Sequence, residues 1–162
     1  MEEADFVKKK QEDREVLKRW LGAVLGDSIK SMVDSPSWTG VADVEVVLKN
    51  GRHVWFKVQT ITEKNATQLC PRYSVSRKMR LEMEKMRRKK RTESIFAFRK
   101  WDVSYGKSPK ELEDFWLADF ADFKYDEWER PGSSYALISV ELIKQAHPKV
   151  LEEVEKKAAL PK

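Results

Sequence analysis

The chain has 162 residues, 41% of them hydrophobic, and its six Trp and seven Phe indicate a folded interior rather than disorder. This length suits one domain around one core. No apolar run reaches the roughly 18 residues that span a membrane, no signal-peptide pattern opens the chain, and one Cys with two His fits neither a disulfide framework nor a zinc site. We therefore expect an intracellular, cytoplasmic protein with no membrane partner.

The charge of +5 is unevenly distributed. Residues 72–100 carry twelve Lys or Arg against three Glu, whereas residues 101–130 carry nine acids against four bases. A block this basic attracts nucleic acid, because each neutralised phosphate releases condensed counterions. The alternative is a solvated helix balanced by its acidic neighbour.

The first half of the chain predicts a helix followed by a hairpin. Residues 5–26 place one apolar face at helical spacing, made of Leu17, Trp20, Leu21, Val24 and Leu25. Residues 27–40 are expected to form a polar loop with a short element near Ile29 and Val33. Strands over 43–49 and 52–61 are predicted around Asn50-Gly51, because this pair between two strand-like runs is a strong hairpin signal.

The second half predicts a further helix and more strands. After a loop at 63–73, residues 74–91 are predicted to form a helix capped by Ser74 or Ser76. Its core stripe comprises Val75, Met79, Met83 and Met86. The remaining predicted elements are strands at 94–99 and 115–120 around a polar loop at 101–113, a strand or helix lead-in at 135–140, and a C-terminal helix at 148–159 with Pro148 in its first turn.

This order of elements is typical of an α/β domain, with a mixed sheet flanked by helices on both faces. We expect one core domain over residues 1–132. A C-terminal strand and helix, residues 133–162, are expected to pack on the same domain.

Polar groups at the hairpin and in the first helix mark a candidate site. Asp43 opens the first strand of the hairpin, and Lys57 and Gln59 occupy alternate positions on the second. Asp13 lies four residues before Leu17, so it shares the apolar face of the helix. A carboxylate there is costly unless it is paired, although an acid near a helix N-terminus is also favoured by the helix dipole.

This layout resembles the core of the PD-(D/E)XK nuclease superfamily, in which an Asp opens one strand and a Glu-x-Lys lies on the next. Here Lys57 takes the place of the Glu, and Gln59 takes the place of the Lys. The string Asp13-Arg14-Glu15-Val16-Leu17-Lys18 is similar to the Glu-Arg-Glu-h-h-Lys helix (h, apolar) of archaeal Holliday junction resolvases. The resemblance covers about residues 8–120, includes phage-encoded relatives, and implies a restriction-endonuclease-like fold.

The resemblance also implies a metal-dependent site. Enzymes of this kind cleave phosphodiesters with Mg²⁺ or Mn²⁺ held by oxygen ligands. The metal-side candidates are Asp13, Asp43 and Glu45, which lies two residues from Asp43 on the same strand face. The catalytic candidates are Asp43, Lys57 and Gln59. A cation at Lys57 would repel metal, so we expect the nuclease centre to be weak or lost, with Lys57 exposed or paired with Asp43.

The second helix supplies the candidate nucleic-acid contacts. Basic ends of helices make phosphate contacts that position a protein without reading sequence. The candidates are Arg77, Lys78, Arg80, Lys85, Arg87, Arg88, Lys89, Lys90 and Arg91. Trp38, in a polar loop before Asp43, could stack on a base, with ordinary packing as its alternative.

Three functions remain open from the sequence. The leading hypothesis is a DNA-binding protein of nuclease-like fold with a degenerate centre and no cofactor. The second is an active Mg²⁺-dependent endodeoxyribonuclease or Holliday junction resolvase. The third is a protein-interaction module whose basic face meets an acidic partner. The resemblance implies a homodimer, with residues 115–128 either at its interface or in a second core layer.

Overall fold

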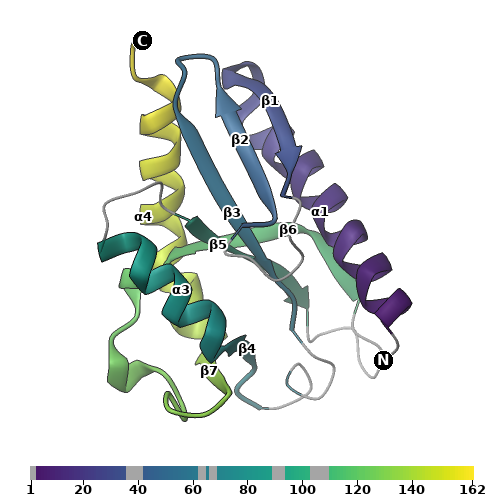
Figure 1. Ribbon diagram of the computed structural model, residues 1–162, viewed down its shortest axis with the longest axis vertical. Helices are drawn as coiled ribbons and strands as arrows, with labels where there is room; N and C mark the ends of the chain where they lie inside the picture. The colour runs from purple at the N-terminus through teal and green to yellow at the C-terminus, as the bar shows by residue number, and fades with distance from the viewer. Residues whose placement is uncertain (1–2, 36–41, 62–64, 66–68, 89–93, 103–109) are drawn as a thin grey trace.

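The structure is a computed structural model that describes residues 3–35, 42–61, 65, 69–88, 94–102 and 110–162. Its centre is a five-stranded sheet in the order β1-β2-β3-β5-β6 (Figure 1). These strands are β1 (Ile29–Asp34), β2 (Val44–Leu48), β3 (His53–Gln59), β5 (Ser94–Asp102) and β6 (Lys110–Asp119). Since β3 and β5 are parallel and the other neighbours are antiparallel, the sheet is mixed, as predicted.

A smaller antiparallel sheet pairs β4 (Arg72–Ser76) with β7 (Tyr135–Ser139). The long helices within the described residues are α1 (Glu3–Leu25), α3 (Arg77–Arg88) and α4 (Val140–Ala159). Short 3₁₀ turns lie at η1 (Gly26–Ser28), η3 (Phe120–Asp122) and η4 (Tyr125–Glu127). Among the residues described, no helix combines the length and the apolar character that a membrane crossing requires.

Alternation along the central strands divides the interior into two cores. On β5, Ile95 and Ala97 face the core shared with α1 and α4, whereas Phe96 and Phe98 face the core shared with α3 and the small sheet. Helices therefore flank both faces of the main sheet, which confirms the predicted architecture.

The hairpin follows its prediction closely. Gly51 adopts a φ of 88°, in the left-handed region that favours glycine, and the register pairs Val44 with Phe56. The Asn50 side chain donates hydrogen bonds to the carbonyl oxygens of Lys157 (2.8 Å) and Leu160 (2.9 Å) at the end of α4. The turn therefore also holds the C-terminal helix against the sheet.

The predicted start of the second helix was wrong. Ser74 and Val75 belong to strand β4, where Val75 pairs with Ala136 of β7, and α3 begins at Arg77. Ser76 does cap this helix, since its Oγ accepts a hydrogen bond from the Met79 N–H at 3.1 Å. Pairing with a strand some sixty residues away decided the conformation, against the local pattern.

Two other boundaries also differ from prediction. The C-terminal helix begins at Val140, capped by Ser139, so Pro148 lies inside the helix and not in its first turn. Both ends of the predicted loop at 101–113 belong to strands, because β5 and β6 extend into it through the pairs Trp101–Glu111 and Asp102–Lys110, and residues 103–109 lie outside the described residues.

The acidic apolar segment 115–128 packs within the chain's own core. Phe115, Leu117, Phe123 and Trp128 are all buried there. Of the two roles expected for this segment, the structure shows the second core layer. The homodimer remains a prediction.

Candidate functional site

Asp43 is the centre of a buried ion-pair network. It directly precedes β2 and is fully buried, and its N–H donates to the Phe56 carbonyl oxygen at 2.7 Å. Its carboxylate accepts a hydrogen bond from the Val58 N–H at 2.8 Å. Helix α1 brings Arg14 Nη2 to 3.2 Å from Asp43 Oδ1 and Lys10 Nζ to 3.5 Å from Oδ2. From β3, Lys57 Nζ also lies 3.5 Å from Oδ2.

A second buried pair adjoins this one on α1. Asp13 Oδ1 accepts a hydrogen bond from Arg99 Nη1 of β5 at 2.7 Å, and Oδ2 accepts one from Thr60 Oγ1 at 3.0 Å. Both Asp13 and Arg99 are buried. Buried charges are costly unless they are paired and hydrogen-bonded. The buried charge of Asp13, which the sequence placed on the apolar face, is therefore stabilised by Arg99 and Thr60.

Basic side chains surround both carboxylates among the residues that the structure describes. Two carboxylates, Asp13 and Asp43, face four basic side chains, which are Lys10, Arg14, Lys57 and Arg99. Burial lowers the pKa of Lys57 to about 8, although the attraction of Asp43 acts in the opposite direction. Most Lys57 side chains are therefore still charged at neutral pH.

The carboxylates that the sequence suggested as metal ligands are engaged by other groups of the protein. Both oxygens of Asp43 and both oxygens of Asp13 already accept from a cation, a hydroxyl or an N–H group, whereas Mg²⁺ needs converging oxygen ligands that are open to it. Glu45 accepts a hydrogen bond from Trp55 Nε1 and lies 3.3 Å from His53 Nδ1. Within the described part of the chain, no three His, Cys, Asp or Glu side chains are placed to share a metal ion.

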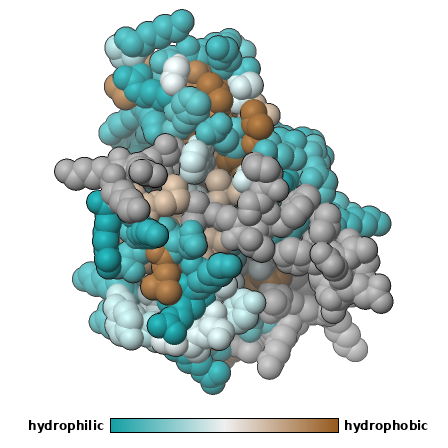
Figure 2. Space-filling model, in the orientation of Figure 1, coloured by the Kyte–Doolittle hydropathy of each residue, from teal (hydrophilic) through white to brown (hydrophobic). Residues whose placement is uncertain are grey.

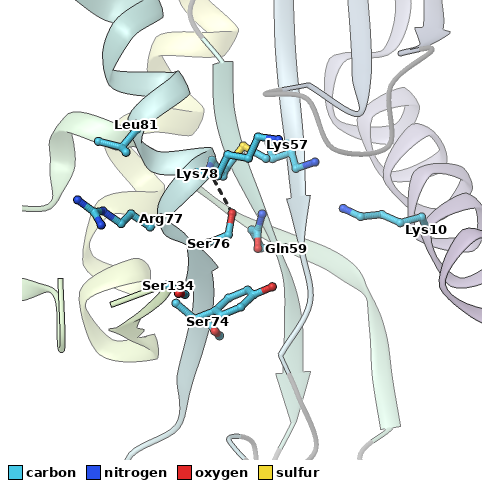
Figure 3. Close-up of a pocket in the computed structure, with 11 residues that line it drawn as sticks. Lys10, Lys57, Gln59, Ser74, Ser76, Arg77, Lys78, Leu81 and Ser134 are labelled. Carbon is cyan, nitrogen blue, oxygen red and sulfur yellow. Dashed lines mark hydrogen bonds between the residues drawn. The ribbon is translucent and has the colours of Figure 1, made fainter. Parts of the chain in front are cut away.

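A cavity of about 670 Å³ opens beside the network, between α1, β3 and the start of α3 (Figure 3). Lys10 reaches it from α1, and Lys57 and Gln59 reach it from β3. Across from them lie Ser76, with Arg77 and Lys78 at the beginning of α3. The described lining contains four cations and no carboxylate, so the cavity is suited to an anion.

The predicted basic residues separate into different environments. Arg77 and Lys78 are exposed at the cavity, and Lys85 and Arg88 are exposed further along α3. Arg80 is buried instead and donates to the Pro131 carbonyl oxygen at 3.0 Å, so it holds a loop. The Arg87 side chain, residues 89–91 and Trp38 lie outside what the structure describes.

Several members of the network were missed at the sequence level. Lys10 and Arg14 lie one turn apart on the stripe that continues to Leu17 and Leu21, and this spacing was a usable signal. Arg99 gave no local signal, because its partner Asp13 lies 86 residues away. Lys57 was expected to be exposed or paired, and it is both paired and buried.

The fold of this chain is found among known structures. No protein-family model matches the chain, and no curated protein matches its sequence. Among solved structures, a Holliday junction resolvase from the hyperthermophilic archaeon Archaeoglobus fulgidus superposes with a TM-score of 0.51 over 87% of this chain and 96% of that chain. The chain has a restriction-endonuclease-like fold. At 10% identity, the likeness shows the fold alone.

Proposed function

We propose that this chain is a DNA-binding protein of restriction-endonuclease-like fold that does not cut DNA. In this proposal, an ion-pair network stands where the resemblance to nucleases implies a metal site. The observation that carries the proposal is the environment of Asp43, which is fully buried and contacted by Lys10, Arg14 and Lys57. This carboxylate serves the fold as a counter-ion.

The proposed loss of cleavage follows from charge. A divalent ion at Asp43 would meet three cations within the same small volume. Two unit charges about 4 Å apart interact by roughly 4 kcal/mol at the effective dielectric typical near a protein surface, and a divalent ion doubles this. Lys57 could release its proton, since burial lowers its pKa to about 8, but the Arg14 guanidinium group would still lie beside Asp43.

The proposed DNA binding rests on the surplus of cations around the cavity. Lys10, Lys57, Arg77 and Lys78 line it, and α3 continues outward with the exposed Lys85. In the orientation of Figure 1, most of the described surface is hydrophilic and its apolar patches are small and separate (Figure 2). Cations on such a surface neutralise phosphates in a sequence-independent way.

Fluorescence anisotropy on labelled duplex, single-stranded and four-way-junction DNA tests the proposal. We expect binding at low salt that weakens linearly on a double-logarithmic plot as salt rises, with the same affinity in Mg²⁺ and in EDTA. Lys78→Ala should reduce the salt slope by about one, because one phosphate contact is lost. Absence of binding to every DNA at low salt would reject the proposal and favour the protein-interaction alternative.

A further inference from the structure

A second cavity, of about 340 Å³, adjoins the cationic one across α3. The two share Arg77 and Leu81, which lie one helical turn apart. In Figure 3, Arg77 points away from Lys57, toward the far side of the helix. The second cavity is lined by the aromatic side chains Phe120, Phe123, Tyr125 and Trp128.

We propose that the two cavities together bind one unpaired nucleotide of a nucleic-acid strand, with its phosphate in the cationic cavity and its base in the aromatic cavity. This inference rests on the proposed function and names the kind of nucleic acid that the protein selects. It adds a base-binding site formed by the segment 120–132, which lies outside the position of the nuclease centre.

The cationic cavity has the groups that a phosphate requires. Lys10, Lys57 and Lys78 can supply charge from three sides, and Ser76 and Gln59 offer neutral polar groups between them. The twelve-residue helix α3 also begins at this cavity, so its N-terminal N–H groups add to the positive potential. Hydroxyl, amide and basic side chains thus line one volume.

The aromatic cavity offers stacking surfaces for a base. Tyr125 is 77% exposed although it is an aromatic residue in a small turn. Phe120, which is only partly buried, lines the same cavity. Behind these two rings, the buried Arg80, Phe123 and Trp128 form the floor of the cavity, with the Arg80 guanidinium 5.2 Å from the Trp128 ring centroid and Phe123 edge-on to Trp128 at 5.7 Å. Aromatic rings and planar guanidinium groups are the surfaces on which bases stack.

The arrangement selects an unpaired base over a paired one. Bases inside a duplex are already stacked on both faces, and only a base outside the stack can enter a pocket between aromatic side chains. The shared wall of Arg77 and Leu81 sets the phosphate and base cavities next to each other, as in a single nucleotide. It also gives a role to Leu81, an apolar side chain that is 53% exposed on a basic helix.

Anisotropy in EDTA, comparing a blunt duplex with the same duplex bearing a short single-stranded overhang, tests the inference. We expect the overhang to bind roughly tenfold more tightly, since stacking on an aromatic ring changes affinity by roughly five- to 150-fold per base. Tyr125→Ala should remove most of this preference and Tyr125→Phe should keep it. Arg77→Ala should reduce the preference, whereas Lys85→Ala, which removes the same charge from α3 outside both cavities, should weaken both DNAs equally.

Equal affinity for blunt and overhanging DNA, or a preference that Tyr125→Ala leaves intact, would overturn this inference while leaving the proposed function standing. Absence of binding to every DNA at low salt would overturn both. Competition by phosphotyrosine without competition by a nucleoside monophosphate would assign the paired cavities to a phosphopeptide and overturn the nucleotide assignment.

Discussion

Replacing Asp43 by Asn should strongly destabilise the fold. The carboxylate is the counter-ion of Arg14 and Lys57, each only 2% exposed, and of the partly exposed Lys10. Asn keeps the shape of the side chain and can still accept the Val58 N–H hydrogen bond, so the substitution isolates the charge. It leaves three cations close together without their shared counter-ion.

The magnitude follows from the burial of these groups. Breaking a buried ion pair by removing one partner costs about 3–5 kcal/mol, because the remaining charge is uncompensated. For a domain of this size, each kcal/mol corresponds to roughly 2–4 °C in Tm. We therefore expect the Tm of Asp43→Asn to fall by about 10 °C, with a matching loss in the free energy of unfolding.

Differential scanning calorimetry and urea denaturation measure this effect. Glu152→Gln is the control, because it removes one charge from an exposed i,i+4 pair with Lys156 and should leave Tm unchanged. Adding Lys57→Gln to Asp43→Asn should recover part of the loss, so the two substitutions should be non-additive.

The opposite result would refute the reasoning. Carboxylates that cluster to hold metal strain the metal-free fold, so neutralising one of them leaves stability unchanged or raises it. If Asp43→Asn were as stable as the wild type, or more stable, Asp43 would not be the counter-ion of this network.

Three further predictions concern the same network. Burial lowers the pKa of Lys57 from 10.5 to about 8, so the unfolded chain keeps this proton to higher pH than the folded chain does. The free energy of unfolding should therefore rise with pH between these two values. In urea denaturation, the free energy of unfolding of the wild type relative to that of Lys57→Gln should increase by on the order of 2 kcal/mol between about pH 7 and pH 9.5. A difference between the two proteins that does not change with pH would contradict this. Millimolar Mg²⁺ should leave the Tm of the metal-free protein unchanged in a thermal-shift assay, since only a ligand that binds the folded state raises Tm. A Tm that rises and saturates with Mg²⁺ would show that the folded protein binds this metal. Arg99→Met should lower the free energy of unfolding by about 3 kcal/mol by leaving Asp13 buried without its guanidinium partner, and Arg99→Met with Asp13→Asn should be more stable than Arg99→Met alone.

The sequence predicted the parts of this molecule that local chemistry determines. Asn50-Gly51 set the hairpin because few other residues adopt the backbone angles of such a turn. The alternation on β3 and the place of Asp43 at the start of β2 predicted that Lys57 is either exposed or paired with Asp43, and the structure contains the pair. The apolar stripe on α1 also indicated that Asp13 is buried and needs a partner.

Long-range pairing determined the rest. Residues 74 and 75 continue the apolar pattern of the helix, yet they form a strand because they pair with β7. The partner of Asp13 proved to be Arg99, a strand residue with no local sign of that role. The aromatic cavity likewise depends on how the turns at 120–127 pack against α3. Hydrophobic periodicity in the sequence does not predict packing of this kind.

A cleavage assay tests the central claim most directly. Labelled duplex, overhanging and four-way-junction DNA would be incubated at low salt with excess wild-type protein in Mg²⁺, in Mn²⁺ and in EDTA, and binding would be measured on the same samples. We expect binding in all three conditions, with every strand intact. Metal-dependent cutting that disappears in folded Asp43→Asn protein would contradict the account and establish Asp43 as part of a working nuclease centre.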